Sequence, residues 1–487
     1  AYYDLRKLKK IAVIGGAPET LCDTGNQGGG TWNREGIILF GNGPGGIHRV
    51  SATGGVSTAV TSLDTTRGDT FHTTPAFLPD GHHFLFYVMH AEPAKQGIYL
   101  ASLEGGETRQ LVSADAWIIK VAQSSANPRE GYLTFARQGA LMAQAFDFSR
   151  NEVTGNPVRI AERVSAPLGL FAHYSLGENG TLVLLEKETA QRLTWVDRKG
   201  KKLGTTGPAE QFYGPSISPD GKRLAVGRLN SQLQTQDIHL FNLVGGEGTP
   251  FTFSPANDQS PVWSPEGNRI VWSSWQTGTP NLFQKTTNGA GRDELLVRST
   301  YQLYPSSWSA DGKFLAFIEV NPKTAVDIWV VPMEGEHKPW LWLNTTATET
   351  SPRISPDGKW IAYQSNESGR NEIYVQAFVP GAAASGSKRQ LSTNGGAIPN
   401  WRKDGRELYY VSADGKMMVV DITLSAELKA GTPKELFSLQ GIQTLTNAGN
   451  GYNVTGDGQR FLFVTSAEDA SVPPFTVVLN WMAELKK

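Results

Sequence analysis

One short phrase recurs along the whole chain, and this repeat constrains the fold more than any other feature of the sequence. Clear copies read SPDGKR at 218–223, SADGKF at 309–314 and SPDGKW at 355–360. Successive glycines of the phrase are separated by 41 to 53 residues. The glycines are Gly36, Gly81, Gly131, Gly180, Gly221, Gly267, Gly312, Gly358, Gly405 and Gly458. Because a single hydrophobic core stops growing near roughly 250–300 residues, a chain of 487 residues with this pattern predicts a repeat array.

The residues around each glycine predict a β-hairpin. Asp-Gly, Glu-Gly and Asn-Gly supply the positive φ that a tight turn between antiparallel strands requires. An apolar or aromatic anchor stands four residues before the glycine in eight copies. These anchors are Trp32, Phe77, Ile217, Trp263, Trp308, Ile354, Trp401 and Val454. Since apolar residues also alternate after the turn, as in Leu224/Val226 and Leu315/Phe317, both flanking segments are predicted strands.

A third strand follows each hairpin, for example GIYLA at 97–101 and DIWVV at 327–331, and leads to a short fourth strand. Four strands in about 45 residues are typical of one blade of a β-propeller. No helical stretch interrupts the series, apart from a terminal turn at 481–487. The sequence therefore predicts an all-β protein of about ten four-stranded blades. The anchor tryptophans are expected to pack between neighbouring blades and form the core.

The spacing of the repeats divides the chain unevenly. Residues 191–487 contain six units in good register, which is a suitable size for one closed propeller. The hairpin at 192–204 is expected to close this ring by pairing with the last unit, whose strands are VTGDGQRFLFV at 454–464 and FTVVLNW at 475–481. Residues 1–190 predict a second, N-terminal propeller that is incomplete at its start, because KLKKIAVIGG at 7–16 is similar to a third strand. A single ring of about ten blades is the alternative.

Composition and charge exclude several classes of function. Lys and Arg number 45 and Asp and Glu 46, so a net charge of −1 supplies no field that would attract nucleic acid. Cys22 is the only cysteine, which rules out an internal disulfide and a cysteine zinc cluster. No stretch reaches the 18 apolar residues of a membrane helix, and we expect no membrane insertion. The first residue is Ala1, which suggests a mature product or a fragment.

Four further motifs are interpreted structurally. Gly41, Gly43 and Gly46 spell GxGxxG, but the loop joins two strands and opens no helix for a phosphate. One predicted blade contains four histidines. We expect these histidines to occupy exposed turn and strand positions and not to form a metal site. They are His72, His82, His83 and His90. The turn aspartates are expected to bond amides of their own turns and not calcium. They are Asp220, Asp311, Asp357, Asp404 and Asp457.

A binding surface is predicted at the opposite end of the blades, where the loops after each second strand gather. These loops differ between blades and carry aromatic, amide and charged groups suited to a peptide, a protein or a polar ligand. The candidate residues are Arg228, Asn230, Trp275, Gln276, Glu319, Asn321, Asn366, Glu367 and Arg370. The sequence contains no GxSxG nucleophile motif. We therefore expect no catalytic residues, no cofactor and no metal.

Longer phrases link the chain to a known group of proteins. They include RGDTFHTTPAFLPDGHHFLF at 67–86, LTWVDRKGK at 193–201, SPDGKWIAYQSNESGRNEIYVQAF at 355–378 and TVVLNWMAELKK at 476–487. With these residues the chain resembles the TolB-like, WD-type propeller repeats of bacteria. More closely, it resembles the extracytoplasmic C-terminal region of bacterial receptor-type serine/threonine protein kinases. The resemblance spans nearly the whole chain.

The resemblance implies a sensory or interaction module of the cell envelope that binds an unknown ligand or protein. It implies an extracytoplasmic location and no catalytic residues, because HRD, DFG and a catalytic lysine context are missing here. Two alternatives remain open, a free-standing TolB-like scaffold of the periplasm and an accessory propeller of a separate hydrolase.

Overall fold

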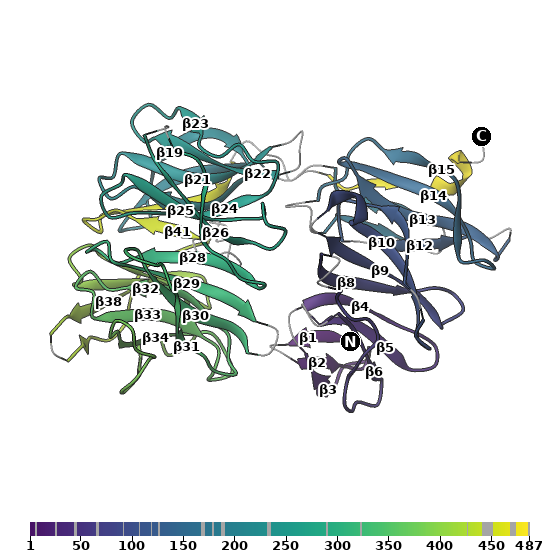
Figure 1. The fold of residues 1–487 in the computed structure, drawn as a ribbon, viewed down its shortest axis with the longest axis horizontal. Coiled ribbons are helices and arrows are strands. Elements are labelled where there is room, and N and C mark those ends of the chain that lie inside the picture. Colours follow the sequence, from purple (N-terminus) through teal and green to yellow (C-terminus); the bar gives the residue numbers. More distant parts are fainter. Residues whose placement is uncertain are drawn as a thin grey trace. The chain divides into compact units, whose positions relative to one another are not determined.

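The structure, a computed structural model, consists of antiparallel strands with one short α-helix, α1 (Trp481–Glu484), and a 3-10 turn, η2 (Pro93–Lys95), among the described residues (Figure 1). This confirms the predicted all-β class. The chain divides into two compact units, Ala1–Glu188 with Val472–Lys487 (unit 1) and Thr189–Ser471 (unit 2). The described residues are 1–4, 7–24, 27–42, 46–64, 68–90, 92–106, 108–117, 119–124, 127–166, 171–177, 180–186, 190–230, 235–288, 291–321, 324–425, 427–440, 451–467 and 474–485.

Unit 2 contains six sheets in its described part, which we number blades 1 to 6. Blade 1 is β20 (Phe212–Ile217), β21 (Arg223–Asn230), β22 (Thr235–Asn242) and β23 (Gly248–Pro250). Blade 2 is β24 (Asp258–Trp263), β25 (Arg269–Ser274), β26 (Asn281–Thr286) and β27 (Glu294–Val297). Blade 3 is β28 (Gln302–Trp308), β29 (Phe314–Asn321), β30 (Ala325–Pro332) and β31 (Trp340–Leu343).

The remaining blades continue the same antiparallel order. Blade 4 is β32 (Glu349–Ile354), β33 (Trp360–Ser365), β34 (Glu372–Ala377) and β35 (Arg389–Gln390). Blade 5 is β36 (Gly396–Trp401), β37 (Glu407–Ser412), β38 (Lys416–Thr423), β39 (Lys429–Ala430) and β40 (Lys434–Ser438). Blade 6 is β18 (Gln191–Asp197), β19 (Lys202–Glu210), β41 (Tyr452–Val454) and β42 (Arg460–Ser466).

Blade 6 joins the two ends of unit 2. Its strand order is β19-β18-β42-β41, so the first two strands of the unit pair with its last two. Thr194 lies opposite Phe463 in this register, and the hydroxyls of Thr194 and Thr465 are 2.7 Å apart. The hairpin at 192–204 therefore pairs with the last repeat, as the sequence predicted, and closes a six-bladed ring.

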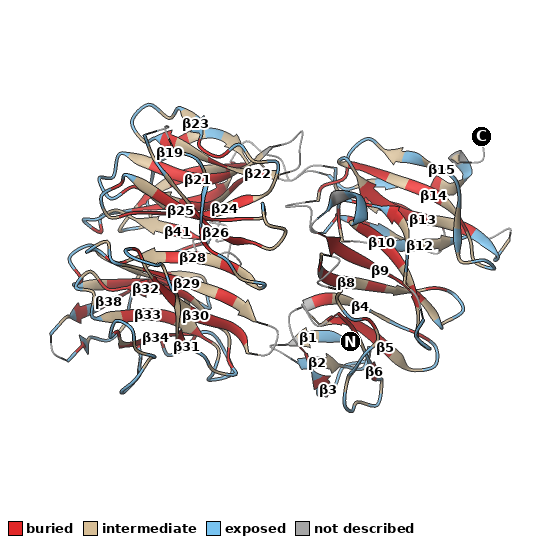
Figure 2. Cartoon of the chain, viewed as in Figure 1, coloured by how far each residue is buried: buried red, intermediate tan, exposed pale blue. Residues whose placement is uncertain are grey.

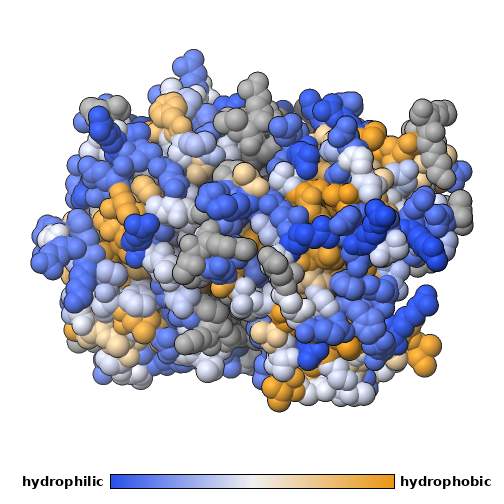
Figure 3. Space-filling view, turned by 45° about the vertical axis from the view of Figure 1, so that its right-hand side comes forward, coloured by the Kyte–Doolittle hydropathy of each residue, from blue (hydrophilic) through white to orange (hydrophobic). Residues whose placement is uncertain are grey.

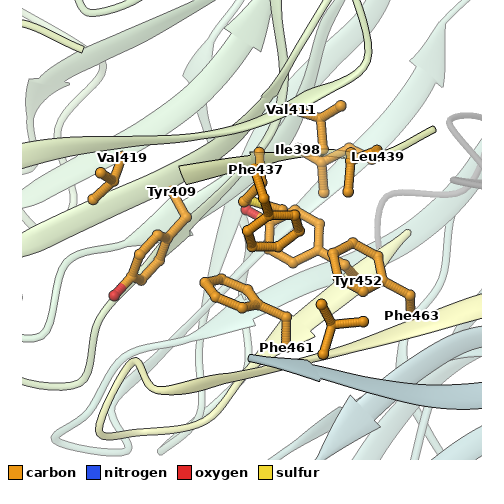
Figure 4. Packing of buried hydrophobic residues seen from close by; sticks show 11 residues of the cluster. Ile398, Tyr409, Val411, Val419, Phe437, Leu439, Tyr452, Phe461 and Phe463 are labelled. Atoms are coloured by element: carbon orange, nitrogen blue, oxygen red, sulfur yellow. The ribbon is translucent and has the colours of Figure 1, made fainter. Parts of the chain in front are cut away.

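Hydrophobic clusters fill the contacts between neighbouring blades. Figure 2 shows buried residues along the strands and exposed residues mainly in the connecting loops. The contact between blades 5 and 6 contains five aromatic side chains. The Phe461 ring lies 5.2 Å from the Tyr409 ring and 5.5 Å from the Phe437 ring, and Phe463 and Tyr452 complete the group (Figure 4). Because one blade cannot bury both of its faces, these contacts provide the core of the ring.

Unit 1 contains five sheets in its described part. The first sheet contains β1 (Tyr2–Asp4), β2 (Lys7–Lys10) and β3 (Glu19–Asp23). The second contains β4 (Gln27–Trp32), β5 (Ile37–Asn42), β6 (Ile47–Ser51) and β7 (Thr58–Ala59). The third contains β8 (Asp69–Phe77), β9 (His83–His90), β10 (Gly97–Ser102) and β11 (Arg109–Ser113). The other two are β12 (Lys120–Gln123), β13 (Glu130–Arg137), β14 (Ala140–Asp147) and β15 (Glu152–Ala161); and β16 (Tyr174–Leu176), β17 (Leu182–Leu184) and β43 (Thr476–Val478).

The C-terminal strand corrects one sequence-based assignment. The segment 475–481 was expected to pair within the second propeller, whose range was predicted as 191–487. Instead, β43 pairs with β17, so that Val477 lies opposite Val183 in unit 1. Trp481 is 2% exposed and packs 5.7 Å from the Tyr132 ring. Period-two patterning identifies a strand but not the sheet that it joins, because both sheets offer an apolar face.

An anchor tryptophan links consecutive blades by its ring and by its indole nitrogen. Trp263 is 5% exposed, and its Nε1 donates a hydrogen bond of 2.8 Å to the Ser216 carbonyl of blade 1. The guanidinium of Arg223 lies 4.7 Å from the Trp263 ring centroid. In blade 5, Trp401 Nε1 donates to the Arg353 carbonyl of blade 4 at 2.9 Å. Trp263 and Trp401 thus hold neighbouring blades together, as predicted, whereas the anchor Trp32 of unit 1 is 47% exposed and contradicts the prediction for its blade.

The turn aspartates bond their own turns in every predicted copy. In blade 1, Asp220 Oδ1 accepts the Lys222 amide at 3.0 Å and the Ser218 hydroxyl at 2.5 Å. The Ser218 hydrogen bond holds the pKa of the Asp220 carboxyl below its usual value. The equivalent bonds join Asp311 to Lys313, Asp357 to Lys359, Asp404 to Arg406 and Asp457 to Gln459.

Replacing Asp220 by alanine is expected to lower the free energy of unfolding by about 1 kcal/mol at pH 7, the net value of such a hydrogen bond. Because the folded-state pKa is lowered, the contribution is present above the ordinary aspartate pKa and is lost as the pH falls through the folded-state value. Urea unfolding at pH 7 and pH 3 measures both effects. Asp220→Asn keeps an acceptor oxygen, so its free energy of unfolding should fall by less than that of Asp220→Ala. If the loss caused by Asp220→Ala is equal at pH 7 and pH 3, the role assigned to the Asp220 carboxylate is contradicted.

Candidate binding rim

The candidate binding residues lie at one end of the unit 2 blades, which we call the rim. They stand at or after the last residues of the second strands β21, β25, β29 and β33, opposite the Asp-Gly turns. Since strands alternate in direction within each blade, every loop that leaves a second strand emerges at this end. The repeat therefore determines where the rim lies, whereas the loop sequence of each blade determines which side chains the rim presents.

Blade 2 presents Trp275 and Gln276 on the rim. The Trp275 amide donates to the Asn257 carbonyl at 3.0 Å, and its own carbonyl accepts the Gly278 amide at 2.9 Å, so the loop is a tight turn. The Trp275 ring is half-buried, and its Nε1 has no hydrogen-bond acceptor among the described residues. Gln276 is exposed and donates to Asp293 at 3.3 Å.

Blade 4 presents Glu367 and Arg370. Glu367 pairs with Lys388, and Arg370 is 59% exposed at its side chain. Arg370 Nε donates to Glu372 at 2.7 Å, and its Nη2 donates to the Thr393 carbonyl at 2.6 Å. The predicted Asn366 is occupied internally, because its Oδ1 accepts the Thr348 amide at 2.8 Å.

The predicted residues of blades 1 and 3 mostly make contacts within the fold. Arg228 pairs with Glu210, and Glu319 is 8% exposed and accepts the Ser299 hydroxyl at 2.9 Å. Burial raises the pKa of Glu319, and Asn321 bonds the same carboxyl. Asn230 ends β21, and its side chain lies outside the described residues.

The solvent-accessible part of the rim is therefore narrower than the sequence indicated. Gln276, Glu367 and Arg370 are exposed residues, whereas Trp275, Arg228 and Asn321 are partly exposed. An aromatic ring, an amide and two charges of opposite sign can together bind a mixed polar and apolar surface. On the face of the molecule seen in Figure 3, hydrophobic residues form separate patches among hydrophilic ones.

Buried carboxyls behind the rim were missed by the sequence analysis. Asp258 is 0% exposed and accepts Trp272 Nε1 at 3.1 Å; burial raises its pKa to about 6. Glu349 is 1% exposed and accepts the Thr345 hydroxyl at 2.6 Å; burial raises its pKa to about 7. Both acids stand five residues before an anchor, in DQSPVW and ETSPRI, and this recurrence was the available signal.

The histidines of unit 1 differ from the prediction in part. His82 and His83 are partly exposed and bond Glu104 and Asp80 at 3.0 and 2.6 Å. His72 and His90 were also expected to be exposed, but they are 3% and 6% exposed. The inward direction of a strand residue depends on which sheet packs against it, which the local pattern did not reveal.

The buried pair faces a carboxylate. His72 Nε2 lies 3.6 Å from Asp69 Oδ2, and His90 Nε2 lies 3.8 Å from Asp69 Oδ1. His90 Nδ1 accepts the Glu92 amide at 2.8 Å, so the neutral ring carries its proton on Nε2 and cannot offer that nitrogen to a metal. Among the residues that the structure describes, no group of three His, Cys, Asp or Glu could hold a metal ion.

Two other sequence features have plain structural positions. The GxGxxG loop connects β5 to β6, where the Asn42 amide bonds the Gly46 carbonyl at 3.0 Å; Gly43 lies outside the described residues. Cys22 is buried as a free thiol. Within the described ranges, no helix has the length and apolar character of a membrane span.

Comparison with known proteins shows that part of the chain matches a known family model. Residues 205–338 match the family model of the TolB beta propeller domain, and these residues, which include blades 1 and 2 and most of blade 3, are TolB-like repeats. An uncharacterized protein of Agrobacterium fabrum is 24% identical over 261 residues, covering 52% of this chain and 85% of that protein. The Tol-Pal system protein TolB of Francisella tularensis is 26% identical over 150 residues, covering 31% of this chain and 34% of TolB.

Other similar proteins include an enzyme and a solved structure. An uncharacterized peptidase of Bacillus subtilis is 26% identical over 212 residues, covering 43% of this chain and 30% of the peptidase. The structure of a putative TolB from Agrobacterium tumefaciens is 21% identical, with a TM-score of 0.47, and covers 58% of this chain and 99% of that chain. The chain spans about a third of the length of the TolB and peptidase relatives.

Proposed function

We propose that unit 2 is a non-enzymatic binding propeller that recognises a protein, a peptide or a polar ligand at its rim. The observation that carries this proposal is the contrast between the two ends of the blades. One end repeats the same aspartate-bonded turn, whereas the other end exposes Trp275, Gln276, Glu367 and Arg370 on loops that differ. Variable loops on a rigid scaffold are the usual place for recognition.

The wider role that we propose is that of a sensor or interaction region in a bacterial envelope signalling protein of the serine/threonine kinase type. Its support is the resemblance of the phrases at 193–201, 355–378 and 476–487. An extracytoplasmic location belongs to the same proposal. A free-standing TolB-like scaffold is the second candidate, and the match of residues 205–338 to TolB repeats favours it.

Sequencing the native gene upstream of the codon for Ala1 separates these two roles. A kinase domain followed by an apolar span of about 18–25 residues supports the receptor role. A signal peptide followed only by further blades supports the scaffold and contradicts the kinase connection.

The rim proposal is tested by photocrosslinking in an envelope extract. A photoreactive residue at Gln276 or Glu367 is expected to give specific adducts, and one at Lys359 on the opposite turns is not. Equal adducts from both ends of the blades contradict the proposal.

The identified adduct protein is then titrated against Trp275→Ala combined with Glu367→Ala, and we expect an affinity loss of about tenfold or more. The melting temperature should stay within a few degrees, because both loops are turns at the surface. Arg370 is left unchanged, since its removal would leave the buried Glu372 carboxyl without its guanidinium partner. Unchanged affinity contradicts a role of the rim.

A further inference from the structure

Asp258 and Glu349 occupy the same position in two different blades. Asp258 begins β24 and lies opposite Ser274, the last residue of β25. Glu349 begins β32 and lies opposite Ser365, the last residue of β33. The two acids thus stand where the chain enters the innermost strand of blade 2 and of blade 4.

Around Asp258, the contacts link blade 2 to blade 1. Thr252 Oγ1 accepts the Ile238 amide of β22 at 2.9 Å, and the same hydroxyl bonds Asp258. Trp272 Nε1 donates to Asp258 Oδ1 at 3.1 Å. A continuous set of hydrogen bonds therefore runs from the third strand of one blade to the second strand of the next.

Around Glu349, the contacts link blade 4 to blade 3. Glu349 Oε1 accepts the hydroxyls of Thr345 at 2.6 Å and Ser365 at 3.3 Å. The preceding residue, Thr348, forms a bridge with Val326 at the start of β30. The segment 345–349 is thus held both by this bridge and by the Glu349 carboxyl.

The surroundings of both carboxyls disfavour a negative charge. Asp327 of β30, Tyr363 of β33 and Glu367 of the following loop face Glu349, and Glu319 of β29 lies opposite Asp327. Asp293, which pairs with Lys285, faces Asp258. Among the described residues, no Lys or Arg pairs with Asp258 or Glu349, and neither Asp258 Oδ2 nor Glu349 Oε2 has a hydrogen-bond partner. Burial therefore destabilises the ionised carboxylate relative to its state in water, although the donated hydrogen bonds partly offset this effect.

We propose that Asp258 and Glu349 form a protonation switch in unit 2. In mildly acidic solution both carboxyls are neutral, and the segments 252–258 and 345–349 are held against the preceding blades. As the pH rises through neutrality, each ionised group favours an open segment in which water reaches it. The proposal does not depend on the function proposed for the rim.

The direction of the pH dependence follows from the thermodynamic linkage between proton binding and closure of the segments. A carboxyl whose folded-state pKa is raised to about 6 or about 7 binds its proton more tightly in the closed state than in an open, hydrated one. The stabilisation is complete below the ordinary carboxyl pKa and is lost as the pH rises through the folded-state value.

Hydrogen exchange read by mass spectrometry at pH 5.5 and pH 8, corrected for the intrinsic rate, tests the switch in the whole chain. In the wild type, protection of 345–349 against exchange is expected to be lower at pH 8 than at pH 5.5, on the order of tenfold. Protection of 252–258 is also expected to be lower at pH 8. Glu349→Gln should remove the change at 345–349 only, and Asp258→Asn the change at 252–258 only. Glu334→Gln, at an exposed position, should leave both changes intact.

Blade 5 supplies an internal control within the wild type. Gly396 begins β36 opposite Ser412, at the same register position. The buried carboxyl near this segment, Glu372, accepts the Gly395 amide at 3.0 Å and, unlike Asp258 and Glu349, has a cationic partner, Arg370, at 2.7 Å. Protection of 391–396 should therefore be equal at both pH values, which keeps the test valid if a variant fails to fold. Equal wild-type protection of 345–349 at the two pH values, or an unaltered pH response in Glu349→Gln, overturns the proposal.

Discussion

Trp263→Ala is expected to lower the free energy of unfolding of unit 2 by about 3–5 kcal/mol, the range for truncating a large buried aromatic side chain. The substitution removes a ring that is 5% exposed, the hydrogen bond to the Ser216 carbonyl and the surface on which Arg223 rests. Urea unfolding followed by circular dichroism measures the loss.

Trp401→Ala is the matched comparison for this prediction. Trp401 has the same place in blade 5 and the same kind of indole hydrogen bond, but its ring is only partly buried. We therefore expect a smaller loss of stability for Trp401→Ala than for Trp263→Ala. A melting shift near zero for Trp263→Ala would contradict its place between the blades.

Phe461→Ala is expected to cost a similar 3–5 kcal/mol, and to act at the point where the ring closes. The Phe461 side chain is 0% exposed and contacts Tyr409 and Phe437 of blade 5 across the blade contact (Figure 4). Since β42 also joins the ends of unit 2, a cavity here weakens both the core and the closure.

The measurement combines urea unfolding with limited proteolysis of the 451–467 region. Phe253→Ala is the control, because Phe253 is 74% exposed in the same unit and its removal should change stability by less than about 0.5 kcal/mol. Equal stability of Phe461→Ala and Phe253→Ala would disprove the closing role of this cluster.

The sequence predicted the repeated elements because their signals are local. An Asp-Gly turn, an anchor four residues earlier and alternating apolar residues lie within one hairpin, and the structure contains these hairpins. Gly131 is an exception to the predicted turn chemistry, because it lies inside β13 and has no positive φ. The pairing of 192–204 with the last repeat was also predicted, since a ring of identical blades needs a strand pair to close. The place of β43 was not, because the choice between two sheets is made by packing that is distant in sequence.

The candidate site was predicted only in outline. The candidate residues lie near the ends of the second strands because alternation of strand direction is fixed by the repeat, and their role in binding stays a prediction. Which side chains remain accessible was not predictable, since Arg228 pairs with Glu210 of blade 6 and Asn366 bonds the Thr348 amide at the open end of the β32–β33 pair. The burial of Asp258 and Glu349 likewise depends on the neighbouring blade.

The return of β43 has a mechanical consequence. Unit 2 is topologically an insertion between two adjacent strands of one sheet, because β17 precedes it and β43, the partner of β17, follows it. Tension applied between β2 and β43 is therefore borne first by contacts within unit 1, and unit 2 stays unstretched until β43 separates from β17. In the sheet of β16, β17 and β43, the pairing of β17 with β43 thus prevents unit 2 from being stretched while the pairing holds.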